Sequence, residues 1–407
     1  MIFIAMMQTL GLEFVDSSII KETIDNMYKA INDYALDKRG DVGSWVREES
    51  MRSLNILIDQ LFYNYKPELL KEIIPQDGHE KFFINFIGTI LQQLMEKIDK
   101  IRQVAGQVLQ SFLIKFGPDL PNFEDKDILM AIFVFNEEEK QEKSLDSAYL
   151  DRRGYLDVKF TYRPWRNPAF VFPQVVPLLE SKNFRKYIFT GIISSAGGLT
   201  ESTVKSSLDI LIKYISSLKG KEDEAIKKQE FLKSFNDIFE ENLKNERITV
   251  PLMKTLESLL RTTYFAETDL GEQLIRMQEL CAQEILRTKN ITKLVTCAGI
   301  LGELLEFSEV KEKALRSLLI MLFNPFPKVR KLVSESLYNY LLALEDFTSM
   351  FETEEKYDEA IVLLSETDWG MKLKELSAEM KKPTFEIFGQ EPPVPKKKPE
   401  PAEGNQA

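Results

Sequence analysis

Apolar residues recur at every third or fourth position along almost the whole chain, and this spacing limits the fold more than any other feature. It places the apolar side chains on one face of an α-helix, whereas a half-buried strand would alternate at every second position. Alternation is scarce, and AIFVF (131–135) is the one short strand candidate. The clearest helical stretch, 82–98, carries Phe83, Phe86, Ile87, Ile90, Leu91, Leu94, Met95 and Ile98 on this spacing. The pattern predicts an all-α fold.

Four segments share a second regularity, in which a β-branched or apolar residue and a base are followed by small or apolar residues at helical spacing. This order is typical of the second helix of a HEAT repeat, where a small residue lets helices approach and the base pairs with an adjacent turn. Such repeats are about 40–47 residues long and must stack to bury their apolar faces. We therefore expect a HEAT/armadillo-type α-solenoid of stacked antiparallel helix pairs. The four segments are Val46-Arg47…Ser50…Leu54, Ile101-Arg102…Ala105…Leu109, Val204-Lys205…Leu208…Ile212 and Val329-Arg330…Val333…Leu337.

Two stretches interrupt the repeats and divide the chain into four parts. Residues 1–135 are expected to form helical repeats, and 136–168 form an inserted loop that is first polar and then rich in proline and aromatic residues. Repeats resume over 169–390. Residues 391–407 form a Pro/Lys/Glu-rich tail without an apolar face, which we expect to be disordered. The apolar start, MIFIAMM, suggests a helix without its partner and hence a fragment of a longer array.

Charge and cysteine content exclude several classes of function. The net charge of −11 opposes binding to nucleic acid and to anionic membrane surfaces, because both need a cationic face. We find no signal peptide and no apolar run long enough to span a bilayer, so no membrane insertion is expected. Cys281 and Cys297 lie in helical, apolar surroundings and are expected to be inert core residues in a reducing compartment.

The sequence offers no arrangement of residues for catalysis. His79 is the single histidine, and with two distant cysteines it cannot supply the ligands of a zinc site. Neither a phosphate-binding loop nor a dinucleotide fingerprint occurs. The carboxylates are abundant but show no pairing that singles out an acid and a base. We therefore expect no enzyme activity, no cofactor and no metal.

The stretch SSAGGLTEST (194–203) permits two interpretations. Gly197 and Gly198 could expose backbone N–H groups to an anion. They could also form a turn between paired helices, with Thr200 as N-cap of the helix that carries Lys205. The turn is favoured, since the lysine of a phosphate-binding loop is missing.

The arginines of the repeat pattern also have two interpretations. An exposed arginine can stabilise the transition state of a bound GTPase, and Arg47, Arg102 and Arg330 are the candidates for such a contribution in trans. Their shared position in the repeat favours a structural role at the helix edge. Together with Trp45, Gly197, Gly198, Thr200 and Lys205, they are the candidate partner-binding or repeat-edge residues.

The tripeptide Arg39-Gly40-Asp41 matches an extracellular adhesion motif but lies directly before an amphipathic helix. Gly40 can form the turn and Asp41 can cap the helix. Trp45 and Val46 would then begin the apolar face of that helix. We therefore interpret this segment as a junction between two helices and not as an adhesion site.

Several of these segments resemble the C-terminal portion of the tubulin-folding cofactor D family (tubulin-specific chaperone D). The resemblance covers most of the chain to about residue 390, and GGLTES followed by a Thr-Val-base sequence is particularly characteristic of the family. The segments that carry it are RGDVGSWVREESMRSL (39–54), FPQVVPLLESKNFRKYIFTGIISSAGGLTESTVKSSLDIL (172–211), NPFPKVRKLVSESLYNYLL (324–342) and YDEAIVLLSETDWGMKLKELSAEM (357–380).

The resemblance implies a chaperone of late tubulin folding that captures β-tubulin. It implies cofactors C and E and an Arf-like small GTPase as partners during assembly or disassembly of the α/β-tubulin heterodimer. GTP hydrolysis would occur on tubulin and would be stimulated only by the assembled complex. The implied location is the cytoplasm, with association with microtubules or centrosomes. A generic HEAT-repeat scaffold, as in nuclear transport or phosphatase assembly, explains the periodicity equally well but not the GGLTESTVK and RGDVGSWVRE segments.

Overall fold

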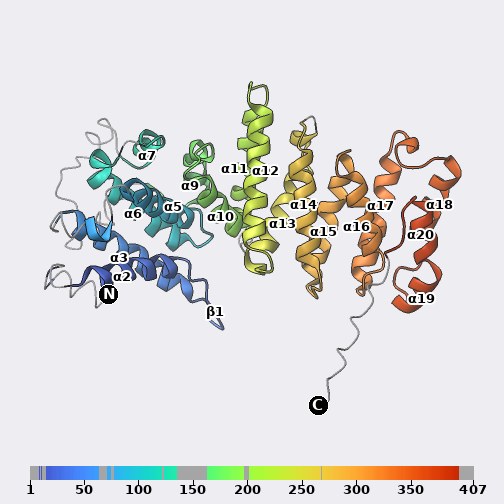
Figure 1. The fold of residues 1–407 in the computed structure, drawn as a ribbon, viewed down its shortest axis with the longest axis horizontal. Coiled ribbons are helices and arrows are strands. Elements are labelled where there is room, and N and C mark those ends of the chain that lie inside the picture. Colours follow the sequence, from blue (N-terminus) through green and yellow to red (C-terminus); the bar gives the residue numbers. More distant parts are fainter. Residues whose placement is uncertain are drawn as a thin grey trace, which may run out of the picture. The chain divides into compact units, whose positions relative to one another are not determined.

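The structure is a computed structural model, and it describes residues 9, 11, 15–63, 71–74, 78–121, 123–134, 163–196, 201–266 and 268–393. Figure 1 shows that these residues form helices almost throughout, which confirms the predicted all-α solenoid of HEAT/armadillo type. The chain divides into two compact units, Met1–Thr255 and Leu256–Ala407, and each is described by itself. This boundary falls inside a helix and not at the insertion inferred from the sequence.

The first unit consists of helices that pack on their neighbours along the chain. Helix α2 packs on α3, α3 on α6, and α5 on both α6 and α10, while α10 packs on α11 and α12. Pairs formed by successive helices thus stack on the next pair, which is how an α-solenoid buries its apolar faces. The elements are α2 Ser17–Ile31, β1 Leu36–Asp37, β2 Gly40–Asp41, α3 Gly43–Tyr63, α5 His79–Leu94, α6 Asp99–Phe116, η3 Gly117–Asp119, α7 Lys126–Phe133, α9 Pro168–Gln174, η5 Val176–Leu179, α10 Arg185–Ala196, α11 Glu201–Leu218, α12 Glu224–Glu241 and α13 Glu246–Leu260, which crosses the boundary.

The second unit continues the same arrangement. Helix α15 packs on α14, α16 and α17, then α17 packs on α18 and α18 on α20. In Figure 1, α14 to α17 stand side by side as consecutive yellow to orange helices. The elements are η6 Thr263–Phe265, α14 Gly271–Ile285, α15 Ile291–Glu303, η7 Leu304–Glu306, α16 Lys311–Met321, α17 Pro327–Ala343, η8 Phe347–Ser349, α18 Glu354–Glu366, α19 Leu373–Glu379 and α20 Lys381–Ile387.

The apolar residues that recur at helical spacing in the sequence form the core of the structure. Of the residues predicted to share one face over 82–98, those from Phe83 to Met95 are fully or almost fully buried, whereas Ile98 precedes α6 and is half-buried. Phe86 of α5 packs against Phe112 of α6, with their ring centroids 4.7 Å apart and edge to face, an arrangement that aromatic rings favour. Cys281 and Cys297 are buried and free, which confirms their prediction as core residues.

The strand prediction at 131–135 is wrong. Ala131, Ile132 and Phe133 complete α7, Val134 is extended, and residue 135 lies outside the described residues. Leu129, Ile132 and Phe133 are buried at i, i+3 and i+4, so the short apolar run follows helical and not alternating burial. Within the described ranges the only strands are β1 and β2, which form a two-residue antiparallel hairpin around Lys38 and Arg39.

The last residues of the predicted insertion belong to the core of the first unit. Trp165 is 2% exposed and stacks on Phe133, with ring centroids 5.4 Å apart. Its indole also lies against Gly106 of α6, where a Cβ atom would overlap it. Most of the insertion (136–162) and of the predicted tail (394–407) lies outside the described residues, so these two predictions stay untested.

Candidate functional site: buried arginines and an exposed tryptophan

Arg330 of α17 is a buried anchor between two loops. Its side chain is almost fully buried, and burial lowers the pKa of its guanidinium from the usual value. Nη1 donates to the carbonyl oxygen of Asn324, in the loop before α17, at 2.8 Å. Nε donates to the carbonyl oxygen of Trp369 at 2.8 Å, and Nη2 to that of Met371 at 2.6 Å. One side chain therefore holds the start of its own helix to the loop after α18.

Arg102 of α6 makes the same two connections in the first unit. Its Nη1 donates to the carbonyl oxygen of Glu96 at 2.7 Å, six residues earlier, as Asn324 lies six residues before Arg330. Its Nε donates to the carbonyl oxygen of Arg166 at 3.2 Å, next to the buried Trp165. In both units a buried arginine thus binds the loop before its helix and a loop that holds a buried tryptophan.

Arg47 of α3 is a variant of this arrangement. Its guanidinium is fully buried, donates to the carbonyl oxygen of Asp33 at 2.7 Å, and forms an ion pair with Asp41 at 3.0 Å. Asp41 lies six residues earlier, but here the carboxylate and not the carbonyl oxygen accepts. The Asp41 Oδ1 also accepts from the backbone N–H of Ser44, which confirms the predicted cap.

The burial of these three arginines corrects one interpretation of the sequence. Arg47, Arg102 and Arg330 were considered for an arginine finger as exposed side chains, yet each is at most 1% exposed and its guanidinium is bound to the chain itself. A guanidinium has up to five N–H donors, and here most of them are directed at carbonyl and carboxylate oxygens of loops. Of the two interpretations, the structural role at the helix edge therefore fits Arg47, Arg102 and Arg330.

The other repeat-edge candidates divide into two groups. Lys205 is exposed and forms no hydrogen bond or ion pair within the part of the chain that the structure describes, so the fourth segment does not repeat the arginine arrangement. Gly197, Gly198 and Thr200 lie outside the described residues, and the turn and anion interpretations stay untested. Helix α11 begins directly after them, at Glu201.

Trp45 lies on the surface, contrary to its prediction as the start of an apolar face. It is 60% exposed and Val46 is 41% exposed, because the inward side of α3 starts at Arg47 and continues at Met51, Leu54, Ile58 and Leu61. The spacing from Arg47 is four, seven, eleven and fourteen residues, and Trp45 falls on the other side of the helix. The Arg39 guanidinium lies 5.3 Å from the centroid of the Trp45 ring. We call Arg39, Trp45 and Val46 the Trp45 surface.

The Arg-Gly-Asp tripeptide is held internally. Arg39 forms an ion pair with Asp37 at 2.6 Å, Gly40 has a φ of +107° that favours glycine, and the Asp41 carboxylate is bound by Arg47. Its two charged groups are therefore already paired within the chain. This geometry agrees with the predicted junction between two helices.

A buried carboxyl group, Glu96, was not singled out from the sequence. Its side chain is fully buried, and neither carboxyl oxygen has a hydrogen-bond partner. Burial raises the pKa of this carboxyl from its usual value, while Arg47 and Lys97 partly offset the effect. Tyr34 lies nearby, with the guanidinium of Arg47 4.1 Å and that of Arg247 3.5 Å from its ring centroid. Nothing in the local pattern QQLMEKID signals this burial, because a glutamate there fits an exposed turn equally well.

Metal-ligating and thiol side chains among the described residues are arranged as follows. Among them no group of three or more His, Cys, Asp or Glu side chains is placed to bind a metal ion. The His79 ring lies 3.1 Å from the carbonyl oxygen of Ile74, and the pKa of the buried Cys281 thiol is raised by its contact with Cys297 and by burial. A raised pKa keeps a thiol protonated and unreactive. No helix in the described ranges has the length and apolarity needed to cross a membrane.

The family model for the C-terminal part of tubulin folding cofactor D matches residues 84–293, which is more than half of the chain. The chain belongs to this cofactor D family. The match contains Arg102, Lys205, the GGLTES segment and Cys281, whereas Cys297 lies just beyond its end.

Two curated relatives extend the similarity beyond the family model. The chain is 28% identical to the tubulin-specific chaperone D of Dictyostelium discoideum over 330 residues, which cover 76% of this chain and 21% of that protein. It is 23% identical to the tubulin-folding cofactor D of Schizosaccharomyces pombe over 328 residues, covering 78% of this chain and 26% of that protein. The chain thus spans about a quarter or less of these relatives. No solved structure matches it significantly.

Proposed function

We propose that this chain is part of a tubulin-folding chaperone of the cofactor D family and acts by binding other proteins. The match of residues 84–293 to the cofactor D family carries the proposal, and the names of the two relatives support it. The stacked helix pairs offer extended surfaces for large partners, as α-solenoids commonly do. A generic scaffold for nuclear transport or phosphatase assembly has no comparable support.

The client that we propose is β-tubulin, with tubulin-folding cofactors C and E and an Arf-like small GTPase as further partners. The chain would act in the cytoplasm, near microtubules or centrosomes, during assembly or disassembly of the α/β-tubulin heterodimer. Any effect on GTP hydrolysis by tubulin would arise in the assembled complex. With Arg47, Arg102 and Arg330 bound within the chain, this effect would come from orienting tubulin and not from those side chains.

The Trp45 surface is the contact we propose for the first unit. Tryptophan and arginine are enriched among the residues that dominate binding energy at protein interfaces. Here an exposed indole is held by the Arg39 guanidinium, and exposed Val46 lies beside it. The Asp37–Arg39 ion pair and the hairpin restrict Arg39, so less side-chain freedom is lost when a partner binds.

Binding of purified tubulin to the full chain tests the proposal. We expect tubulin to bind the wild type and to bind a Trp45→Ala/Val46→Ser variant at least about tenfold more weakly. Ile226→Ser is the matched control, because Ile226 is 62% exposed on α12 of the same unit. No binding by the wild type above an unrelated α-solenoid would contradict the function. Equal binding by the Trp45 variant and the control would contradict only the surface.

A further inference from the structure

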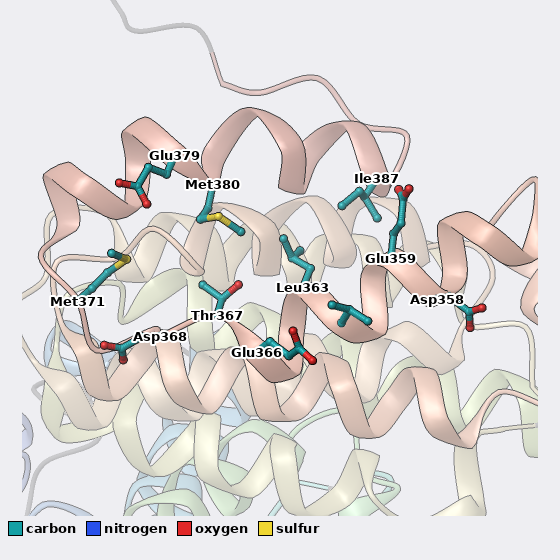
Figure 2. Close-up of a pocket in the computed structure, with 11 residues that line it drawn as sticks. Asp358, Glu359, Leu363, Glu366, Thr367, Asp368, Met371, Glu379, Met380 and Ile387 are labelled. Carbon is teal, nitrogen blue, oxygen red and sulfur yellow. The ribbon is translucent and has the colours of Figure 1, made fainter.

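An apolar groove lies between α18 and the α19–α20 pair in the second unit, with a volume of about 670 Å³ (Figure 2). Its floor comes from α18, the loop between α18 and α19, the junction between α19 and α20, and the end of α20. Val362 is the most open of these floor residues on α18, with 49% of its side chain exposed, while Leu363 next to it is buried. The floor residues are Val362, Leu363, Met371, Met380 and Ile387.

Five carboxylates surround this floor, and the lining contains no lysine, arginine or histidine. Figure 2 shows Glu359 beside Ile387, Asp358 at the start of the α18 lining, Glu366 and Asp368 further along α18 and the loop after it, and Glu379 on the opposite rim. Within the described residues, all except Asp368 lack a hydrogen bond or ion pair, and Asp368 accepts from the backbone N–H of Gly370 at 2.8 Å.

Other carboxylates on α19 and α20, outside the groove lining, form ion pairs with lysines. Glu375 of α19 lies 3.8 Å from Lys372, and Glu386 of α20 lies 3.4 Å from Lys382. Both pairs are formed by residues outside the groove lining. Asp368 interacts electrostatically with the buried Arg330. Asp358, Glu359, Glu366 and Glu379 have no ion pair within the described residues, so a cation supplied by a bound molecule would relieve their mutual repulsion.

We propose that this groove is a docking site for a short amphipathic helix of a partner protein, with apolar side chains on one face and lysine or arginine on its flanks. Apolar side chains would fill the floor, and the flanking cations would pair with the rim carboxylates. The lining of α18 runs from Asp358 to Glu366, roughly 12 Å, which matches about two turns of a bound helix. This site is separate from the Trp45 surface and does not depend on tubulin being the client.

The chain's own tail is the alternative occupant, and two observations disfavour it. Lys396, Lys397 and Lys398 follow the described residues, but Pro392, Pro393, Pro395 and Pro399 exclude a helix with an apolar face there. The carbonyl oxygen of Glu391 accepts from Arg316 at 2.8 Å, on a helix that does not line the groove. The tail thus supplies charge without the apolar residues that the floor requires.

A designed peptide can probe the groove on the full chain. The probe is a fluorescent peptide of about 16 residues with leucine and lysine at helical spacing, since shorter helices are marginal in water. A peptide with glutamate in place of lysine is the charge control. Fluorescence anisotropy would measure both, and we expect the lysine peptide to bind and the affinity to fall with added salt.

Two variants of the groove and one matched control test whether the peptide binds in the groove. We expect Glu359→Gln/Glu366→Gln/Glu379→Gln to weaken binding of the lysine peptide by about tenfold, and Val362→Lys by a similar factor. Val362 is half exposed, so its replacement does not disturb the core. The control, Glu309→Gln/Glu335→Gln/Glu345→Gln, removes the same charge at exposed positions outside the groove and should change affinity less than about twofold.

Three results would overturn the proposal. One is equal binding of the lysine and glutamate peptides, and another is equal weakening by the groove and control variants. The third concerns the chain without residues 394–407. If their removal tightens peptide binding by about tenfold or more, the tail occupies the groove and the site is an internal contact.

Discussion

Arg330 donates a hydrogen bond of 2.8 Å to the carbonyl oxygen of Trp369, a residue 39 positions further along the chain. The same guanidinium binds Asn324 in the loop before its own helix. A buried carbonyl group needs a hydrogen-bond donor. The carbonyl groups of these two loops are not paired by a helix or a sheet, and the Arg330 guanidinium supplies their donors. The contact is therefore a structural bond between successive helix pairs of the second unit.

Replacing Arg330 by methionine is expected to destabilise the second unit by about 3 kcal/mol, because the carbonyl oxygens of Asn324, Trp369 and Met371 lose their donor. Arg330→Lys should also destabilise it, since one ammonium group cannot reproduce the fork of N–H donors. Chemical unfolding followed by circular dichroism measures both. Lys328→Met, two residues earlier on the exposed side of α17, is the control and should stay within about 0.5 kcal/mol of the wild type. A similarly small change for Arg330→Met would contradict the structural role.

Gly106→Ala is expected to destabilise the first unit by about 1–3 kcal/mol, despite the higher helix propensity of alanine. The new Cβ atom would overlap the rigid indole of Trp165. Gly299→Ala is the matched comparison, because the nearest atoms to its Cβ atom belong to the side chain of Glu257, which is flexible and can move. Thermal unfolding of the two variants should therefore differ, and equal effects would show that Trp165 does not pack against Gly106.

Glu96→Gln tests the buried carboxyl through pH. The pKa of Glu96 is raised in the folded chain, so the folded state binds its proton more tightly than the unfolded state. The contribution of this group to the free energy of unfolding is therefore greatest below its ordinary pKa of 4.5 and falls as pH rises through the folded value. Since glutamine stays neutral, the variant should be more stable than the wild type at about pH 7, and this gain should shrink towards about pH 4.

Urea unfolding at several pH values measures this difference. Glu335→Gln, on the exposed side of α17, is the control and should show no such pH dependence. Loss of stability in Glu96→Gln at about pH 7 would mean that the attraction of the charged carboxylate to Arg47 and Lys97 outweighs the cost of its burial and its repulsion by Asp41.

Cys281 and Cys297 are expected to resist alkylation in the folded chain. Both are fully buried, and the pKa of the Cys281 thiol is raised, so the reactive thiolate is scarce and shielded. Iodoacetamide followed by mass spectrometry should label them only after denaturant is added. Rapid labelling of the native chain would show that α14 and α15 separate readily.

The fold could be predicted from the sequence because burial in a stacked helical array follows a simple period. Eight apolar residues of 82–98 were assigned to one face from spacing alone, and all except the half-buried Ile98 are in the core. The run AIFVF failed because five apolar residues satisfy a strand and a buried helix equally well, and only the partner helices decide. Cys281 and Cys297 were predicted correctly because apolar helical surroundings leave little choice for a free cysteine.

The candidate site was less predictable, since it depends on which side of a helix faces inward. Trp45 was placed at the start of the apolar face of its helix, but the buried hydrogen bonds of Arg47 fix the inward face two residues later. The exposure assumed for Arg47, Arg102 and Arg330 failed because their carbonyl acceptors, such as Arg166 and Met371, lie in loops far along the sequence. A local pattern identifies the base but not its distant acceptors.

The reach of the buried arginines also sets where this protein can be shortened. A fragment that stops after α17 would keep the Arg330 guanidinium but lose the carbonyl oxygens of Trp369 and Met371. One that stops before Trp165 would do the same to Arg102, which binds the adjacent Arg166. The smallest fragment that keeps these hydrogen bonds is therefore larger than a helix pair. The buried arginine of the pair donates to carbonyl oxygens in the segment that follows the pair.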